Sequence, residues 1–398
     1  MRRRRPGAGG AVRGPGLTPA ERYLELGLRL GRHVDGLVDA YYGPEELRAQ
    51  VDAEAVVDAA ELVADAAALL ADLPDGWLRD QVLGCETYAR VLAGEAIAYA
   101  DEVEGCYGVR PERTPAAVYE AAHADLDELL PGEGSLFERR QAWRTQHLVD
   151  GDLALAVLED LLPLLRGRAG EIVALPAGER VALEPVRDEP WWAFNYYKGD
   201  LASHVVFNVD VPTTGFDLIE LAAHEVYPGH HTEHCVKEQL LLREQGMLEE
   251  AIQLVPTPQA LLSEGIAEIG LDVVLDDEAR AEAYAVLARH GIEFDVDLTE
   301  RIARVLERLG TTADDAALLV HEDGASPEEA KRYVEQWRLV TPEYAEQSVR
   351  FVTDPTWRAY AITYTAGESL CKAYVAGDPA RFRRLLTEHV RVGDLTAR

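Results

Sequence analysis

Four of the 11 histidines in this chain of 398 residues fall within one stretch, AAHEVYPGHHTEH, at residues 222–234. They are His224, His230, His231 and His234. Glu225 directly follows the first of them. Imidazole nitrogens are common zinc ligands, and a glutamate beside a metal-bound water can act as a general base. The residue types in this stretch therefore predict a metal site that can perform hydrolysis.

The stretch begins like the HExxH motif, in which two histidines one helical turn apart chelate zinc and the glutamate activates the bound water. Here the fourth position after His224 is Pro228, which interrupts a helix, and the pattern is HExxPGHH. In an uninterrupted helix His231 would lie about 20° from His224 and His230 about 120°. A two-residue bulge at Pro228-Gly229 gives His230 the second ligand position instead. We predict His224 and His230 as ligands, with His231 as the substitute that otherwise faces the substrate.

A third ligand is expected from a later helix, because catalytic zinc sites have three protein ligands and a water. The segment LLSEGIAEIG, residues 261–270, supplies Glu264, which lies 40 positions after His224. Two antiparallel helices, one leaving the histidines and one returning, bring this carboxylate back over them. Glu268, one turn further on, is expected to accept the second N–H of a ligand histidine. Gly265 is expected to allow close approach of a neighbouring helix.

Each of these features also has a purely structural explanation. Histidines after a helix-breaking Pro-Gly pair can cap one helix and begin the next, and Glu-Gly pairs often end helices. The joint occurrence of HE at a helix end, PGHH and a later SEGxAE segment favours metal binding. A bound metal could in turn be structural only, holding the turn at Pro228-Gly229 in a helical scaffold. Glu225 separates the two cases, because a structural site does not need it.

The elements that must position these residues are mainly α-helical. Apolar residues recur at helical spacing over 18–170, with Pro and Gly between segments, which predicts an all-helical N-terminal lobe. Residues 171–213 are richer in Val, aromatic and turn residues, which predicts a small β insertion with a strand in SHVVFNVDV. Helical periodicity then returns to the end of the chain. We expect a large helical body with a central cleft, in which the metal-site lobe, 171–398, packs with the N-terminal lobe as one unit.

The composition limits the partners of the protein. A net charge of −32 argues against binding to nucleic acids or anionic membranes. Residues 1–17 contain five arginines and no acidic residue, which is typical of a flexible basic tail. No apolar run follows these arginines and the four cysteines show no CxxC spacing, so we expect a cytoplasmic protein with reduced thiols. Its expected partners are peptides or small amides, and its oligomeric state stays open.

The motif residues resemble the domain of unknown function family 885, whose members carry HExxPGHH followed by an EGWALY-like segment. The resemblance covers approximately residues 190–375, including YYKGDLASHVVFNVDVP before the motif and YAITYTAGESL after it. It implies a gluzincin-like zinc metallopeptidase, with a helical, cleft-bearing architecture like that of the angiotensin-converting enzyme and oligopeptidase group. Zinc would be held by two histidines and a glutamate. This chain reads EGIAEI, without the Trp and Tyr of the family, which leaves the substrate preference open.

The resemblance also suggests a role for Tyr364, which lies one helical turn after Tyr360 in YAITYTAGESL. It is similar to the tyrosine that stabilises the transition state in related helical peptidases. The alternative is a tyrosine that packs in a helix seam. Both explanations are open at the level of sequence.

The expected mechanism is attack by an activated water. Zinc lowers the pKa of its water toward about 7, Glu225 takes the proton, and the hydroxide attacks a peptide carbonyl. Glu225 then passes the proton to the leaving amine. The strand in SHVVFNVDV is expected to pair with an extended peptide by edge addition, with His204 either touching the substrate or serving as an ordinary strand residue. Hydrolysis of a non-peptide amide or an ester is the alternative, because the sequence does not fix which carbonyl is attacked.

Overall fold

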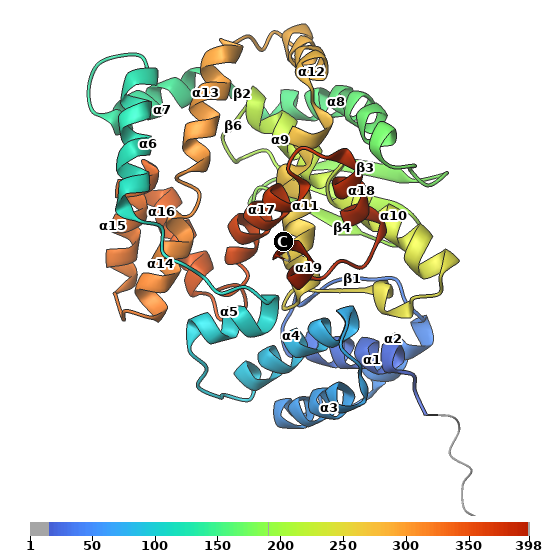
Figure 1. Ribbon diagram of the computed structural model, residues 1–398. Coiled ribbons are helices and arrows are strands. Elements are labelled where there is room, and N and C mark those ends of the chain that lie inside the picture. Colours follow the sequence, from blue (N-terminus) through green and yellow to red (C-terminus); the bar gives the residue numbers. More distant parts are fainter. Residues whose placement is uncertain (1–15, 190, 397–398) are drawn as a thin grey trace, which may run out of the picture.

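The computed structural model describes residues 16–189 and 191–396, and the protein is mainly α-helical, as predicted (Figure 1). Of the predicted basic tail, residues 1–15 lie outside the described residues. The α-helices are α1 (Pro19–Gly31), α2 (Glu45–Ala53), α3 (Ala59–Asp72), α4 (Trp77–Leu92), α5 (Tyr99–Tyr107), α6 (Ala116–Leu129), α7 (Leu136–Gln146), α8 (Gly151–Ile172), α9 (Gly215–Glu225), α10 (His230–Lys237), α11 (Pro258–Val274), α12 (Asp277–Arg289), α13 (Val296–Glu307), α14 (Thr312–His321), α15 (Pro327–Arg338), α16 (Pro342–Thr353), α17 (Ile362–Val375), α18 (Pro379–Thr387) and α19 (Val392–Thr396). A π-helical segment, Glu238–Glu244, continues α10, and a 3₁₀ turn follows at Leu248–Ala251. Within the described ranges, no helix combines the length and the apolar character needed to cross a bilayer.

The strands form three small sheets. They are β1 (Val38–Tyr41), β2 (Leu148–Val149), β3 (Arg180–Val186), β4 (Ala193–Tyr197), β5 (Ala202–Asn208), β6 (Thr213–Thr214) and β7 (Ile252–Leu254). The largest sheet has the order β3-β5-β4, with β3 parallel and β4 antiparallel to β5. This sheet is the predicted β insertion, and it precedes α9 as expected. The other sheets are the antiparallel pairs β1-β7 and β2-β6.

Strand β5 confirms the predicted strand in SHVVFNVDV, but the prediction of edge addition at this strand is wrong. β5 is hydrogen-bonded to β3 on one side and to β4 on the other, so it has no free row of backbone groups for a substrate peptide. His204 of β5 shares a hydrogen bond of 2.8 Å with Glu184 on β3, which makes it an ordinary contact between neighbouring strands. The order of strands in a sheet depends on pairing between distant segments. The residues of a single strand therefore do not indicate whether it lies at the edge or in the centre.

Local capping signals set several helix ends. Thr18 and Ser326 each open a helix with a capping box, in which a glutamate three positions later completes the reciprocal hydrogen bonds. Both starts match the sequence pattern.

However, α1 ends at Gly31 and the chain continues into β1, so the prediction of an all-helical segment over 18–170 is wrong. β1 forms because β7, more than 200 positions later, supplies its partner.

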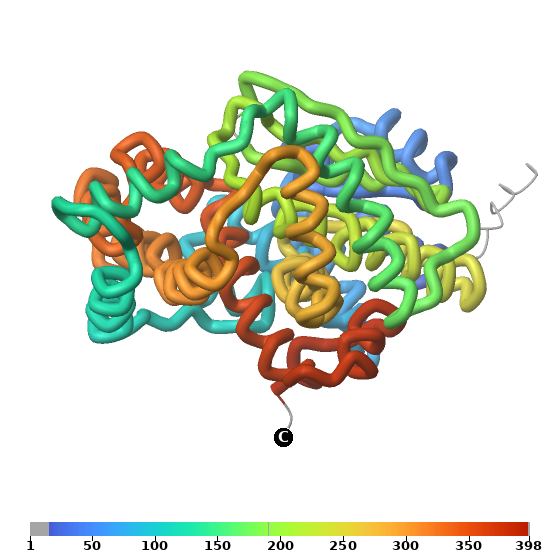
Figure 2. The backbone as a smooth tube through the Cα atoms, turned by 90° about the horizontal axis from the view of Figure 1, so that it is seen from above, coloured from blue at the N-terminus to red at the C-terminus, as the bar shows by residue number. Residues whose placement is uncertain are grey.

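Helix α11 lies in the middle of the molecule, where α9, α10 and α17 pack around it (Figure 1, Figure 2). Most of its residues are buried. It approaches α17 closely at Gly265 and Gly367, because a Cβ at Gly265 would lie 2.3 Å from the carbonyl oxygen of Gly367. This confirms the predicted role of Gly265 in close helix packing. The adjacent Glu264 is therefore carried on a rigid, central element.

Helices from both halves of the chain share interfaces. α4 and α5 contact α11, α8 packs against α9 and α12, and α6 packs against α13. The helices α6, α7 and α13–α16 gather on one side of the molecule, at the left of Figure 1. The metal-site helices α9, α10 and α11 lie on the other side of α17 from this group, and α9 and α10 contact the sheet through β4.

Candidate metal centre

The break between α9 and α10 brings two histidines together. α9 ends at Glu225, the chain turns at Pro228-Gly229, and α10 begins at His230, so the predicted interruption is confirmed. Gly229 is required in the turn, since a Cβ there would lie 1.8 Å from the carbonyl oxygen of His224. The imidazole rings of His224 and His230 lie with their centroids 4.8 Å apart and their planes at 85°. The turn therefore acts as the two-residue bulge that places His230 next to His224.

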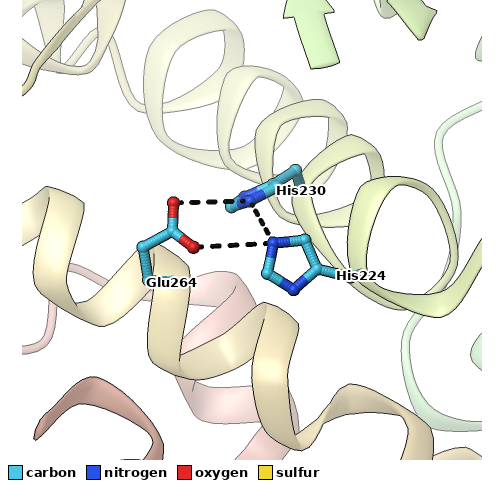
Figure 3. A group of neighbouring side chains, drawn as sticks. All are labelled: His224, His230 and Glu264. Carbon is cyan, nitrogen blue, oxygen red and sulfur yellow. Dashed lines mark hydrogen bonds and ion pairs between the residues drawn. The ribbon is translucent and has the colours of Figure 1, made fainter. Parts of the chain in front are cut away.

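Glu264 on α11 completes the group (Figure 3). The Nε2 atoms of His224 and His230 are 3.2 Å apart and lie 3.5 and 3.7 Å from the carboxylate oxygens of Glu264. One donor atom from each residue lies within 4.8 Å of the other two. A tetrahedral ion with bonds of about 2.0–2.2 Å separates its ligand atoms by roughly 3.3–3.6 Å. The structure thus brings together the three residues predicted as metal ligands, at distances that suit one divalent ion.

The hydrogen bonding of Glu264 also fits a cation at this point. Its Oε1 accepts a hydrogen bond of 2.5 Å from the hydroxyl of Tyr360. Its Oε2 is buried and accepts no hydrogen bond from the described part of the chain. Nε2 of His224 lies 3.5 Å from this oxygen, and a buried carboxylate oxygen without a hydrogen bond costs free energy. A cation held between Glu264 and the two histidines would satisfy that oxygen, and the donor set of two imidazoles and a carboxylate suits zinc.

His230 is oriented by a chain of buried polar groups. Its Nδ1 lies 3.2 Å from Oγ of Ser263, which donates a hydrogen bond of 2.6 Å to Glu233. Lys237 neutralises Glu233 at 2.6 Å. A hydrogen bond at Nδ1 directs Nε2, the other ring nitrogen, toward the metal position. Ser263 directly precedes Glu264, so one turn of α11 supplies both a ligand and the support of another ligand.

His224 has a carboxylate on its outer side. Its Nδ1 lies 3.5 Å from Oε1 of Glu268, the residue predicted for this role. Burial lowers the pKa of His224, but its contact with Glu264 and the charges of Glu268 and Glu225 outweigh this and raise the pKa to about 10. In the metal-free protein His224 therefore holds a proton, which a metal ion must displace.

Replacing Ser263 with alanine is expected to weaken zinc binding roughly 10- to 100-fold, the usual effect of losing an outer partner of a metal-bound histidine. The loss follows because Nδ1 of His230 would have no acceptor and the ring would lose its orientation. Competition with a chromophoric chelator measures the affinity. Ser203→Ala is the matched control, since Ser203 bonds to Nδ1 of His231 instead. Equal affinities for both variants would contradict the proposed support of His230.

His231 does not join the metal group. Its Nδ1 lies 2.8 Å from Oγ of Ser203 and its Nε2 lies 2.9 Å from Glu179, and its side chain is fully buried. Glu179 also accepts hydrogen bonds from Tyr227 at 2.7 Å and from Arg166 at 2.6 Å. His231 is therefore not in reach of Glu264 or of a substrate. It ties the start of α10 to β5 and to the segment before β3.

The hydrogen bonds from His231, Tyr227 and Arg166 to Glu179 make the stability of the folded protein depend on pH. Burial raises the pKa of Glu179, but hydrogen bonds from His231, Tyr227 and Arg166 outweigh it and lower the pKa to about 2. A carboxyl group in the unfolded chain titrates near about 4.3. The stabilisation is therefore complete above about pH 4.3 and is lost as the pH falls toward about 2.

Glu179→Gln is expected to reduce the free energy of unfolding by about 2–3 kcal/mol at pH 7, and the deficit should shrink below about pH 4.3. Urea unfolding of both proteins at pH 7, 5, 4 and 3 measures it. Glu184→Gln on β3 is the control, because Glu184 is exposed and pairs with His204 on the surface of the sheet. A deficit that does not change with pH would show that the charge of Glu179 is not what stabilises the network.

His234, the fourth histidine of the stretch, is also buried. Its ring lies 4.9 Å from that of Tyr197 and 6.2 Å from that of His230, measured between centroids. Burial lowers its pKa to about 4, so it is neutral at pH 7. It packs behind His230 without entering the metal group.

Glu225, the predicted general base, is buried at the end of α9. Burial raises the pKa of its carboxyl group, and the nearby His224 and His230 oppose this without cancelling it. A carboxylate with a raised pKa accepts a proton more readily than an exposed one. The backbone of Glu225 is fixed by Asn195 of β4, whose amide donates a hydrogen bond of 2.6 Å to its carbonyl oxygen.

Tyr364 lies beside the metal group on the first turn of α17. Its ring stands perpendicular to that of Tyr360, with centroids 5.7 Å apart. Burial, followed by the charges of Glu264, Glu268 and Glu225, raises its pKa well above the ordinary value, so the hydroxyl keeps its proton and can donate it to a hydrogen bond. Tyr360 precedes α17 rather than lying within it, so the helix begins later than the sequence pattern indicates.

Several residues of the site carry no clear signal in the sequence. Ser263 lies in the segment LLSEGIAEIG, residues 261–270, and directly precedes the predicted ligand Glu264. This position is the only feature of the sequence that indicates a role for Ser263. Tyr360 reaches Glu264, and Glu179 reaches His231, only through tertiary packing, from segments whose sequences predict no metal chemistry. Asp39 belongs to β1, and burial together with the charge of Glu264 raises its pKa to about 7.

The fold and the site together define a mainly helical protein with a candidate metal centre of two histidines and one glutamate. Neither a protein-family model nor a curated protein matches the chain. A solved structure described as "the putative lipoprotein from Colwellia psychrerythraea" matches with a TM-score of 0.51 and 15% sequence identity over 88% of this chain. This chain spans 58% of the length of that protein. At this identity the similarity concerns the fold alone.

Proposed function

We propose that the protein is a zinc-dependent hydrolase, a metallopeptidase that cleaves short or unstructured peptides. The observation that carries this proposal is the convergence of His224, His230 and Glu264 on one point, with Glu225 directly after the first ligand. Two imidazoles and a carboxylate leave one position of a tetrahedral zinc ion for water. The proposal includes the resemblance to the domain of unknown function family 885, which rests on the same motif residues.

The exposure of the histidines favours a catalytic site over a structural one. The side chain of His224 is 21% exposed and that of His230 is 13% exposed, so both ligand side chains are partly open to solvent. Structural zinc sites are closed by four protein ligands, whereas catalytic sites keep an open position. A scaffold with a structural metal also gives no role to a buried Glu225.

The residues divide the chemical work as follows. Zinc, when bound, supplies a water of lowered pKa and polarises the carbonyl of the substrate. Glu225 accepts the proton of the attacking water and later gives it to the leaving amine. Tyr364 donates a hydrogen bond to the oxygen on which negative charge develops. Tyr360 and Ser263 hold Glu264 and His230 in place.

A cytoplasmic location is part of the proposal. It is supported by the four cysteines, Cys85, Cys106, Cys235 and Cys371, which are all buried and unpaired. Reduced thiols are typical of proteins in a reducing compartment.

The experiment that tests the proposed function combines elemental analysis with a substrate screen. The purified protein is analysed for bound metal and then incubated with a peptide library and with a panel of non-peptide amides and esters. We expect one zinc ion per chain and cleavage of peptides that stops after treatment with a chelator and returns with zinc. Cleavage of amides or esters alone would favour the alternative hydrolase, and bound zinc without any turnover would favour the structural scaffold.

A further inference from the structure

The first turn of α17 is tied to a neighbouring group of helices by a hydrogen bond. Thr365, the residue after Tyr364, donates this bond of 2.5 Å through Oγ1 to Oδ2 of Asp314. Asp314 lies in the first turn of α14, which packs against α15 and α16. These helices are at the left of Figure 1, whereas α17 borders the metal-site helices. The bond therefore joins the segment of Tyr364 to helices that supply no predicted metal ligand.

Asp314 is buried at a cost that packing alone does not explain. It is 4% exposed, and its Oδ1 is buried without a hydrogen-bond partner in the described part of the chain. Burial raises the pKa of its carboxyl group to about 7, although the hydrogen bond from Thr365 opposes this. A buried polar atom that lacks a partner is unfavourable, and an apolar side chain would fill the same space without this cost.

The next residue, Asp315, shows how an aspartate with a packing role is held in the same helix. Its Oδ2 accepts hydrogen bonds from the hydroxyls of Tyr119 at 2.9 Å and Tyr333 at 2.8 Å. Its Oδ1 accepts a hydrogen bond of 3.0 Å from the backbone N–H of Thr114. Asp315 thus joins helices of its own group, on α6 and α15. The side chain of Asp314 instead reaches out of this group to α17.

The bond to Asp314 fixes a different side of α17 from the one that packs on α11. At Gly367 the two helices are so close that a Cβ would lie 2.4 Å from a carbonyl oxygen of α11. This contact sets the distance between the helices. Successive residues of a helix project about 100° apart, so a side chain held at Thr365 also fixes the rotation of α17 about its axis. That rotation determines the direction in which Tyr364 points.

The direction of Tyr364 matters for the proposed chemistry. Its ring packs against Tyr360 with centroids 5.7 Å apart, and the hydroxyl of Tyr360 donates a hydrogen bond of 2.5 Å to Glu264. A donor to the developing oxyanion must come within about 2.7–3.1 Å of that oxygen. A small rotation of α17 is therefore enough to lose the hydrogen bond.

We propose that Asp314 is a positioning residue, which holds Tyr364 through Thr365 in the direction needed to stabilise the transition state. This inference rests on the proposed function. It adds a coupling between the candidate site and a group of helices that provides no ligand. Asp314 acts through Thr365 and not by contact with the substrate.

A paired replacement, Asp314→Leu with Thr365→Val, tests the inference. It removes the hydrogen bond and replaces both partners with apolar groups, so the fold should be kept. We expect kcat on a cleaved peptide to fall roughly 10- to 100-fold while KM and the zinc affinity stay unchanged. Thr365→Ser keeps the hydroxyl and should retain most of kcat. An unchanged kcat in the paired variant would overturn the inference.

Thr353→Val is the matched control for the loss of a threonine hydroxyl. The hydroxyl of Thr353 bonds to the backbone of its own helix, α16, so this variant should keep the kcat of the natural protein. A loss of kcat in Thr353→Val as large as that in the paired variant would overturn the inference, because the effect would not depend on the link to Asp314.

Tyr364→Phe tests the route by which Asp314 acts. This variant lacks the hydroxyl that Asp314 is proposed to place, so the paired replacement should cause no further loss of kcat in the Tyr364→Phe protein. Effects that multiply would show that the link acts on the site by another route, and would overturn the inference.

Fluorine NMR separates this inference from the proposed function, because it needs no turnover. The zinc-loaded protein is prepared with fluorotyrosine, and the signals of Tyr364 and Tyr227 are identified by their absence in the corresponding phenylalanine variants. The paired replacement should shift or broaden the Tyr364 signal and leave the Tyr227 signal unchanged. A shifted signal in a protein that cleaves nothing would support the role of Asp314 and contradict the hydrolase. Peptide cleavage with neither kcat nor the signal altered would do the reverse.

Discussion

Replacing Glu225 with glutamine should reduce hydrolysis roughly 10²- to 10⁴-fold while the protein keeps its zinc. Glutamine has nearly the same shape but cannot accept the proton of the attacking water. Because Glu225 is not one of the three ligands, the metal group of His224, His230 and Glu264 should stay intact. The measurement is kcat/KM on a peptide cleaved in the library screen, with the zinc content determined on the same samples.

Glu220→Gln is the matched control for this variant. Glu220 lies on the same helix, α9, outside the group of predicted ligands, so the same chemical change there should leave turnover close to that of the natural protein. Undiminished hydrolysis in Glu225→Gln would contradict the role of general base. Loss of zinc together with activity would show that Glu225 supports the structure of the site.

Removing a ligand should have the second large effect. We expect much weaker zinc binding in each of the variants His224→Ala, His230→Ala and Glu264→Ala. The loss of affinity should exceed the roughly 10- to 100-fold that follows the loss of an outer hydrogen-bond partner. Each change deletes a donor atom from a group whose members lie within 4.8 Å of one another. Zinc content after dialysis against a weak chelator measures the effect.

His231→Ala is the control that settles which neighbouring histidine binds the metal. Its nitrogens are engaged by Ser203 and Glu179, so this variant should lose stability but retain zinc. Equal zinc content in His230→Ala and His231→Ala would contradict the bulge at Pro228-Gly229 as the device that selects His230.

The parts of the site that lie close in the sequence could be predicted from it. The helix break at Pro228-Gly229 follows from local chemistry, because proline removes a backbone donor and glycine alone fits the turn against His224. Once the break is placed, His230 rather than His231 is the residue that faces His224. Glu264 was predicted as a ligand because an antiparallel helix pair would return the chain over a short distance. In the structure the return passes through the π-helical segment, the 3₁₀ turn and β7 before α11 begins.

The parts that depend on distant pairing could not be predicted. The strand pattern of β5 is local, but its central place in the sheet comes from β3 and β4. β1 continues the helical pattern of α1 in sequence, and it becomes a strand only because β7 pairs with it. Tyr360 reaches Glu264 through the same kind of long-range packing. Their roles arise from packing among segments, which no single stretch of residues specifies.

The central claim is that His224, His230 and Glu264 hold one divalent ion. Anomalous diffraction from crystals of the zinc-loaded protein, recorded on both sides of the zinc absorption edge, tests it most directly. We expect one zinc peak about 2.0–2.2 Å from Nε2 of both histidines and from a carboxylate oxygen of Glu264. A zinc-loaded crystal with no peak at this position, or with the peak at His231 or His234, would show that these three residues do not form the metal site.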